Sequence, residues 1–256
     1  TNNIDPLPAS INYLNSIKVK VETQVKIVLA THWHDDHIKG IADTLERCKN
    51  AVFYCSDALR TDEFRDLIVT YGSSRLLDES GVSELYKVMK ILQSRATNKN
   101  PKFASENKRI WYKTESESSF QKNLELWTLS PSDAAKLLAI RSISKLIPKD
   151  FIKYTTKRRI PDPKQNDIAV ALWLLVGDIH LLFGSDLENN SNEEIGWKAI
   201  LNNPLRPRGK ALFYKIAHHG AASSHHDNIW KDLLIKKPYA CLTPFQLGKN
   251  KIPTKH

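Results

Sequence analysis

A run of histidines and carboxylates directly after an apolar strand constrains this chain more than any other feature. Residues 25–30 are apolar apart from Lys26 and rich in β-branched side chains, which predicts a buried strand. The next residues include four side chains of metal-ligating types within six positions, namely His32, His34, Asp36 and His37. They form no sensible apolar face, so a purely structural role would require each polar group to be satisfied elsewhere. Imidazole and carboxylate without thiolate suit zinc, manganese or iron.

The segments around this run alternate between strand and helix patterns. Helical spacing over 38–49 and a short apolar strand over 51–55 complete a β-loop-α-β unit, which implies a parallel sheet covered by helices. Residues 168–176 and 180–183 flank the turn Gly177-Asp178 and predict a hairpin. The sequence therefore predicts an α/β fold, and no linker divides residues 1–256 into independent domains.

Further elements follow from the same patterns. We expect helices at 8–16, 57–71, 83–95, 133–147, 193–201 and 228–235. We expect strands at 108–113, 123–129, 211–217 and 239–243, and a loop over 96–108.

Three polar clusters stand at the expected ends of strands. They are the run that contains His32, then Asp186 after the hairpin, and His218-His219 after the strand 211–217. Loops at the carboxyl ends of strands converge on one rim of an α/β sheet, where ligands bind. We therefore predict that these clusters form one metal site.

The charge of the chain favours a polyanionic partner. The net charge is +10, and residues 141–164 hold eight Lys/Arg against only Asp150 and Asp162. Phe151 and Tyr154 lie among these cations, and such interleaving can bind a nucleic-acid strand by phosphate contact and base stacking. The alternative is a solvated helix face with ordinary core aromatics. The cations predicted to contact nucleic acid are Lys153, Lys157, Arg158 and Arg159.

The three cysteines, Cys48, Cys55 and Cys241, are too few and too scattered for a disulfide framework. This usage fits a reducing cytoplasm. No stretch is apolar enough for a membrane span, and the first ten residues lack the pattern of a signal peptide. We therefore expect a cytoplasmic protein without a membrane partner.

The motif His-x-His-x-Asp-His after a strand resembles the signature of metallo-β-lactamase-fold hydrolases. Segments 124–131, 166–172, 183–186 and 218–223 follow in an order similar to the hydrolase domain of bacterial competence DNA-uptake proteins. The resemblance covers residues 8–245 and implies an αββα sandwich, with 57–122 and 133–160 as insertions within a single domain.

The resemblance also implies a ligand set for two metal ions, expected to be Zn²⁺ with Mn²⁺ as the alternative. His32 and His34 match the ligands of one ion, and Asp36 and His37 those of the other. Asp186 matches the carboxylate that bridges both ions, and His218 matches the final ligand.

Two departures from the family pattern stand out. Many members carry a third histidine for the first ion just before the strand that here is 168–176, where this chain has Asn166 and Asp167. Water or Asp167 would then complete that ion's coordination. The family also usually begins with a β-hairpin, and nothing before residue 25 has that pattern, so we expect that hairpin to be absent.

The resemblance implies a metal-dependent hydrolase, and the charge favours a phosphodiesterase or nuclease acting on DNA or RNA. Two metal ions would activate a hydroxide, with Asp36 as its orienting residue. Two roles are open for His219. It contacts a phosphate oxygen or protonates the leaving group, or it only supports a neighbouring ligand through a hydrogen bond. One alternative function is hydrolysis of a small molecule such as a cyclic nucleotide, thioester or lactone. The other is a non-catalytic metallo-domain with protein partners in a bacterial defence or uptake assembly.

Overall fold

The computed structural model of the chain describes residues 7–72, 81–117, 120–145, 164–245 and 252–253. The chain divides into two compact units. Unit 1 holds residues 1–55, 59–103 and 142–162, and unit 2 holds residues 56–58, 104–141 and 163–256. Both contain strands and helices, so the predicted α/β class is confirmed. The assignment of residues 1–256 to one domain stays a prediction.

Unit 1 is built on a small sheet with the strand order β1-β2-β3. Strand β1 (Ile27–Ala30) runs parallel to β2 (Val52–Ser56), in register from Ile27↔Val52 to Ala30↔Cys55. Helices α3 (Asp35–Ile38) and α4 (Ile41–Arg47) connect the two strands, which confirms the predicted parallel unit. Strand β3 (Lys102–Ala104) lies where a loop was expected over 96–108, so that prediction was wrong at this point.

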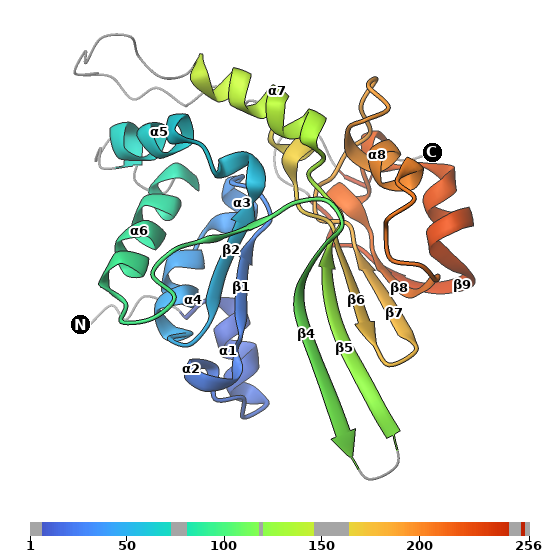
Figure 1. Cartoon of the computed structure of the whole chain (residues 1–256), viewed down its shortest axis with the longest axis horizontal. Helices are drawn as coiled ribbons and strands as arrows, with labels where there is room; N and C mark the ends of the chain where they lie inside the picture. Colours follow the sequence, from blue (N-terminus) through green and yellow to red (C-terminus); the bar gives the residue numbers. More distant parts are fainter. Residues whose placement is uncertain (1–6, 73–80, 118–119, 146–163, 246–251, 254–256) are drawn as a thin grey trace. The chain divides into compact units, whose positions relative to one another are not determined.

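The other helices of unit 1 follow the predicted pattern with altered bounds. Helix α1 (Ala9–Ser16) and the short α2 (Val21–Gln24) precede β1, so the part of the chain described before Ile27 is helical and holds no strand. The helix expected over 57–71 divides into a single turn, Asp57–Leu59, and helix α5 (Asp62–Gly72). Helix α5 packs against α6 (Gly81–Ser94) (Figure 1).

The start of α6 holds the loop that follows β1. Asp35 Oδ1 accepts a hydrogen bond of 2.8 Å from the Gly81 backbone N–H. The side chain of Trp33 is buried and stacks on Phe64, with ring centroids 4.9 Å apart. Gly81 packs so closely that a Cβ atom there would lie 1.9 Å from the carbonyl oxygen of Trp33. Trp33 and Asp35, which stand between the candidate ligands of the motif, therefore anchor its backbone.

Glu84 of α6 fixes the beginning of α4 in a similar way. Its buried carboxylate accepts hydrogen bonds from the backbone N–H groups of Gly40 (3.1 Å) and Ala42 (3.3 Å). Gly40 has a φ of +82°, a conformation that favours glycine and lets the chain turn between α3 and α4. The carboxylate takes up N–H groups that a helix start cannot pair internally.

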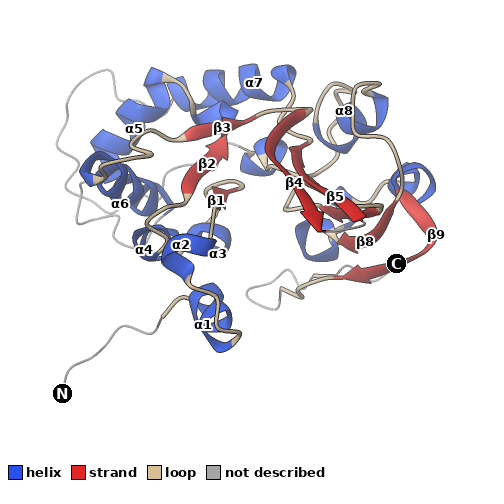
Figure 2. Cartoon of the chain, turned by 60° about the horizontal axis from the view of Figure 1, so that its bottom comes forward, coloured by secondary structure: helices blue, strands red, loops and turns tan. Residues whose placement is uncertain are grey.

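Unit 2 is built on a six-stranded sheet with the order β4-β5-β6-β7-β8-β9 (Figure 1). Figure 2 draws the strands in red and the helices in blue. Strands β4 (Lys108–Glu117), β5 (Phe120–Thr128), β6 (Leu172–Val176) and β7 (Ile179–Phe183) pair antiparallel. Strand β8 (Ala211–Lys215) runs parallel to β7, and β9 (Leu234–Cys241) runs parallel to β8.

Three expectations for unit 2 were wrong in detail. The two strands predicted at 108–113 and 123–129 form one long hairpin that pairs as far as Glu117↔Phe120. Residues 165–168 form a helical turn, so the strand predicted from residue 168 begins at Leu172. The helix expected over 228–235 is a single turn, Ile229–Leu233, and β9 begins directly after it at Leu234.

The core of unit 2 lies on the sheet under helix α8 (Gly196–Asn202). Helix α7 (Asp133–Ser144) lies between β5 and β6 in the sequence. Trp173, Leu182, Leu187 and Trp197 are fully buried there. Trp197 Nε1 donates a hydrogen bond of 2.8 Å to the carbonyl oxygen of Leu187, so burial leaves its indole N–H satisfied. This contact ties α8 to the segment just after Asp186.

No helix among the described residues combines the length and the apolar character that crossing a bilayer requires.

The contact between Gly81 and Trp33 gives a first prediction. Gly81→Ala should lower the free energy of unfolding by about 1–3 kcal/mol, because the added Cβ meets backbone that cannot move aside cheaply. Helix propensity alone would favour alanine by up to about 1 kcal/mol, so the sign of the change identifies the dominant effect. Urea denaturation measures it.

The matched control is Asp66→Ala, on the exposed side of α5. Its stability should change by less than about 0.5 kcal/mol. A Gly81→Ala protein as stable as the control would show that α6 does not hold the motif in this way.

Candidate metal centre

The first half of the predicted ligand set lies in unit 1, at the end of β1. His32 is fully buried, and its Nε2 lies 3.0 Å from His34 Nδ1. The hydroxyl of Thr31 lies 3.1 Å from the other nitrogen of His32, Nδ1. Two nitrogens bound to one tetrahedral zinc ion at about 2.0–2.1 Å lie about 3.3 Å apart. The His32–His34 spacing therefore suits two ligands of one ion, and Thr31 orients the inner ring as supporting residues of metal sites do.

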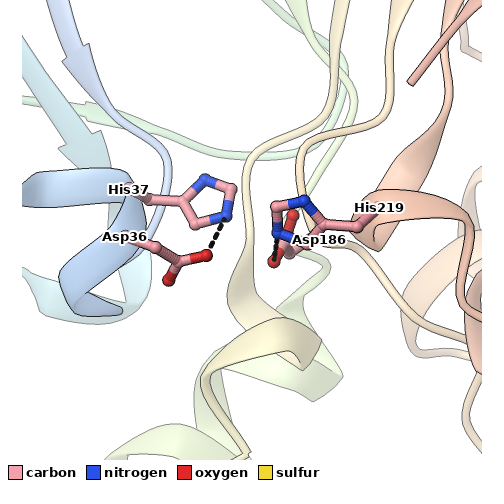
Figure 3. A group of neighbouring side chains, drawn as sticks. All are labelled: Asp36, His37, Asp186 and His219. Atoms are coloured by element: carbon pink, nitrogen blue, oxygen red, sulfur yellow. Dashed lines mark ion pairs between the residues drawn. The ribbon is translucent and has the colours of Figure 1, made fainter. Parts of the chain in front are cut away.

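Asp36 and His37 form a second pair on the first turn of α3. Asp36 Oδ2 lies 3.4 Å from His37 Nε2. Figure 3 marks this contact with a dashed line. The ring of His37 lies 4.4 Å from that of His32, measured between centroids. The four candidate ligands of the motif thus lie close together within unit 1.

The second half of the ligand set lies in unit 2, beyond the ends of β7 and β8. The Asp186 carboxylate is buried, and its Oδ2 lies 3.7 Å from His219 Nε2 (Figure 3). His219 Nδ1 lies 2.8 Å from the backbone carbonyl oxygen of Thr243. A carbonyl only accepts hydrogen bonds, so Nδ1 carries the proton, and in the neutral ring Nε2 presents its lone pair on the Asp186 side.

The backbone of this second half-site is held in an unusual conformation. Ser185, His218 and His219 have φ values of 49°, 43° and 54°, in the left-handed region that few non-glycine residues adopt. The His218 N–H donates a hydrogen bond of 2.8 Å to the Ser185 carbonyl oxygen, which joins the two loops. Gly184 allows this approach, because a Cβ atom there would lie 2.8 Å from that of Ala217. Strained backbone of this kind concentrates at functional sites.

His218 has a partner that the sequence analysis did not assign. Its Nδ1 lies 2.6 Å from Glu188 Oε1, which also accepts hydrogen bonds from Ser223 Oγ (3.0 Å) and Asn166 Nδ2 (3.3 Å). Burial by itself would raise the pKa of the Glu188 carboxyl, but these hydrogen bonds outweigh it and hold that pKa below its ordinary value. Glu188 therefore remains a carboxylate at neutral pH. The only sequence signal was its place two residues after Asp186.

Asp167 is engaged elsewhere in unit 2. Its Oδ2 accepts a hydrogen bond of 2.9 Å from Asn190 Nδ2. Burial raises the pKa of the Asp167 carboxyl, and the bond from Asn190 offsets this only in part. The roles predicted for Asp167 and His218 as metal ligands stay predictions, whereas the residue placed beside Asp186 is His219. Lys153, Lys157, Arg158 and Arg159, predicted to contact nucleic acid, lie outside the described residues.

The donors fit divalent metal ions in both halves. Each half pairs imidazole nitrogen with carboxylate oxygen, the ligand types of Zn²⁺ and Mn²⁺ sites. In each half, a residue that is not a candidate ligand holds one histidine ring by a hydrogen bond. Thr31 holds His32 in unit 1, and the Thr243 carbonyl oxygen holds His219 in unit 2.

This geometry gives a second prediction. Thr31→Val, which keeps the volume of the side chain but removes the hydroxyl, should weaken zinc binding about 10–100-fold. His219→Ala should weaken it at least as much, because it removes a donor itself. Competition with a chromophoric chelator measures the affinity, and elemental analysis counts the ions.

Two variants separate the roles of the adjacent histidines. His218→Ala should retain more zinc than His219→Ala, and His225→Ala, at an exposed histidine paired with Asp227, should bind like the unaltered protein. If His218→Ala loses an ion that His219→Ala keeps, the ligand is His218, as the sequence comparison with the family implied.

Residues 4–89 match the family Metallo-beta-lactamase superfamily. This superfamily consists generally of hydrolytic metalloenzymes that bind divalent metal ions, and the matched segment contains the whole of the half-site in unit 1. The mixed architecture of sheets and helices is consistent with the metallo-β-lactamase fold. The match points to a metal-dependent hydrolase.

Proposed function

We propose that this protein is a metal-dependent hydrolase that cleaves phosphodiester bonds in nucleic acid, and that its two half-sites together hold the metal ions. The observation that carries the proposal is the pairing of His32 Nε2 with His34 Nδ1 at 3.0 Å, at a fully buried position braced by Thr31. Two imidazoles converging in this way have a ready explanation as ligands of one ion.

The chemistry of the donors suggests how the ligands are shared. His32 and His34 would hold one ion, Asp36 and His37 would hold the other together with His219, and the Asp186 carboxylate would be available to both. Bound ions would lower the pKa of a water molecule and polarise the phosphoryl oxygen. Zinc is the metal we expect, with manganese as the alternative.

The chain's own residues supply orientation. Asp36, half-exposed on the first turn of α3, accepts a hydrogen bond from the attacking water and directs its lone pair toward phosphorus. For His218 we propose the substrate contact first assigned to His219, because the Glu188 carboxylate at 2.6 Å from its Nδ1 holds the ring in place. A ring held in this way would contact a phosphate oxygen of the substrate.

The charge of the chain supports a nucleic-acid substrate over a small neutral one. A net charge of +10 raises the local concentration of polyanions and speeds their association. The narrower relationship to competence DNA-uptake proteins, the cytoplasmic location and a place in a larger bacterial assembly all stay predictions.

A cleavage assay tests the proposal. The purified chain is incubated with single-stranded DNA, duplex DNA and RNA in the presence of zinc or manganese, and the products are resolved on a gel. We expect metal-dependent cleavage of at least one polymer. A chelator should abolish it, as should the double variant His32→Ala/Asp36→Ala, whereas His225→Ala should leave it unchanged.

Two other outcomes would contradict the proposal in different ways. Intact nucleic acid with two bound ions would reject the nuclease and leave a hydrolase of small molecules. Intact nucleic acid with no bound ion would reject the shared metal centre itself.

A further inference from the structure

The edge of unit 2 at which β8 and β9 begin carries an unusual concentration of positive charge. Residues 203–210 lead into β8, and residues 231–237 contain the start of β9. The pairing Ala211↔Leu234 brings these two segments together, and Lys210 Nζ donates a hydrogen bond of 2.5 Å to the Lys231 carbonyl oxygen. We call residues 203–210 and 231–237 the basic edge.

The basic edge holds half of the net charge of the chain. Six cations stand against the single carboxylate of Asp232, which leaves a formal charge of +5 out of the total of +10. Within the part of the chain that the structure describes, none of the six forms an ion pair, and all but the half-buried Arg206 are exposed. The six are Arg206, Arg208, Lys210, Lys231, Lys236 and Lys237.

A bulge in β9 coincides with part of this charge. Ala211 of β8 pairs with Leu234, but Phe213, two residues further along β8, pairs with Tyr239, five residues further along β9. Residues 235–238 therefore fall between the paired positions of the described ladder, and Lys236 and Lys237 among them are exposed. Bulges are common next to functional sites, where they can redirect a side chain.

The segment before β8 lines a surface cavity. The cavity has a volume of about 480 Å³, and its lining includes Arg206, Arg208, Lys210 and Asn202 together with the carboxylate residue Asp232. Pro207 restricts the backbone between the two arginines. Gly209, at a φ of +109°, packs so closely on His180 that a Cβ atom would lie 2.6 Å from its Cε1. His180 is itself held, since its Nδ1 accepts a hydrogen bond of 3.0 Å from Trp173 Nε1.

We propose that the basic edge binds the phosphate backbone of a nucleic-acid strand, outside the hydrolytic site. A cluster of arginines and lysines that form no ion pair among the described residues suits several phosphates at once, and arginine can bind each phosphate with two hydrogen bonds. This inference rests on the proposed function for the identity of the polymer. It concerns a different surface, at the opposite end of β8 from Asp186 and His219.

The length of β8 sets a minimum length for a strand that reaches both places. Its five residues span about 16 Å at about 3.3 Å per residue. Along the axis of a duplex, successive phosphates of one strand advance by about 3.4 Å, so a duplex strand needs about five nucleotides to cover this length. The basic edge should therefore affect long substrates and leave short ones unaffected.

The test compares two variants of equal charge. Arg206→Gln/Arg208→Gln removes two cations of the basic edge, and Lys18→Gln/Lys20→Gln removes two exposed cations from unit 1. Fluorescence anisotropy follows binding of a labelled single-stranded DNA of about twenty nucleotides, with chelator present so that the strand stays intact, across a range of salt concentrations.

We expect the arginine variant to bind about tenfold more weakly near 0.1 M salt. Its slope of log affinity against log salt should become shallower by about 1.4, which is about 0.7 for each lost phosphate contact. The control should differ little from the unaltered chain. Equal losses in both variants, or none in the arginine variant, would overturn the proposal.

A second readout separates this inference from the proposed function. With zinc present, the arginine variant should hydrolyse the short reporter bis(p-nitrophenyl) phosphate at the unaltered rate, while its KM for the long strand rises. A chain that binds DNA through the basic edge yet hydrolyses neither substrate would overturn the proposed function alone. A chain that hydrolyses both, with a KM for the long strand unaffected by the arginine substitutions, would overturn the basic edge alone.

Discussion

The burial of His32 is the constraint on which the first half of the candidate site depends. A fully buried imidazole needs partners for both of its nitrogens, because an unsatisfied polar group in the interior costs about 1–3 kcal/mol. Thr31 meets one nitrogen and His34 faces the other. The spacer residues Trp33 and Asp35 hold the loop in this arrangement through Phe64 and Gly81. The motif is thus a packed structural unit as well as a set of donors.

The second half of the site is positioned by backbone conformation more than by burial. Left-handed residues that are not glycine cost of order 1–3 kcal/mol each in general, and unit 2 has three of them at Ser185, His218 and His219. The cost is offset by contacts that only this conformation allows, among them Glu188 with His218 and the Thr243 carbonyl with His219. Pre-organised donors of this kind need little rearrangement when a metal ion or a transition state arrives.

Strand β8 separates two kinds of chemistry in unit 2. Its carboxyl end leads to the candidate ligands, the usual place for reactive groups in an α/β sheet. Its amino end lies at the basic edge, where several cations share one region. Such an arrangement lets long-range electrostatics act on a polyanion without placing lysines among the ligands, where they would compete with metal ions for the carboxylates.

The sequence by itself determined the parts of this protein that local patterns control. The apolar run of β1 and the hairpin of β6 and β7 are visible as periodicity and turn chemistry, and the structure confirms both elements. The match of residues 4–89 to a superfamily of metalloenzymes agrees with the motif there. The candidate ligands of that motif could be named from the sequence because all four lie within six consecutive residues.

Only the tertiary structure decided which way those side chains point and which distant segments meet. His218 and His219 are successive left-handed residues, and His219 lies beside Asp186; no sequence pattern encodes that backbone conformation. Glu188 became part of the site because Ser223 and His218 close around it from far along the chain. The basic edge exists because parallel pairing and a bulge join residues 203–210 to 231–237. Periodicity specifies regular elements, whereas loop direction and long-range pairing follow from the packing of the whole unit.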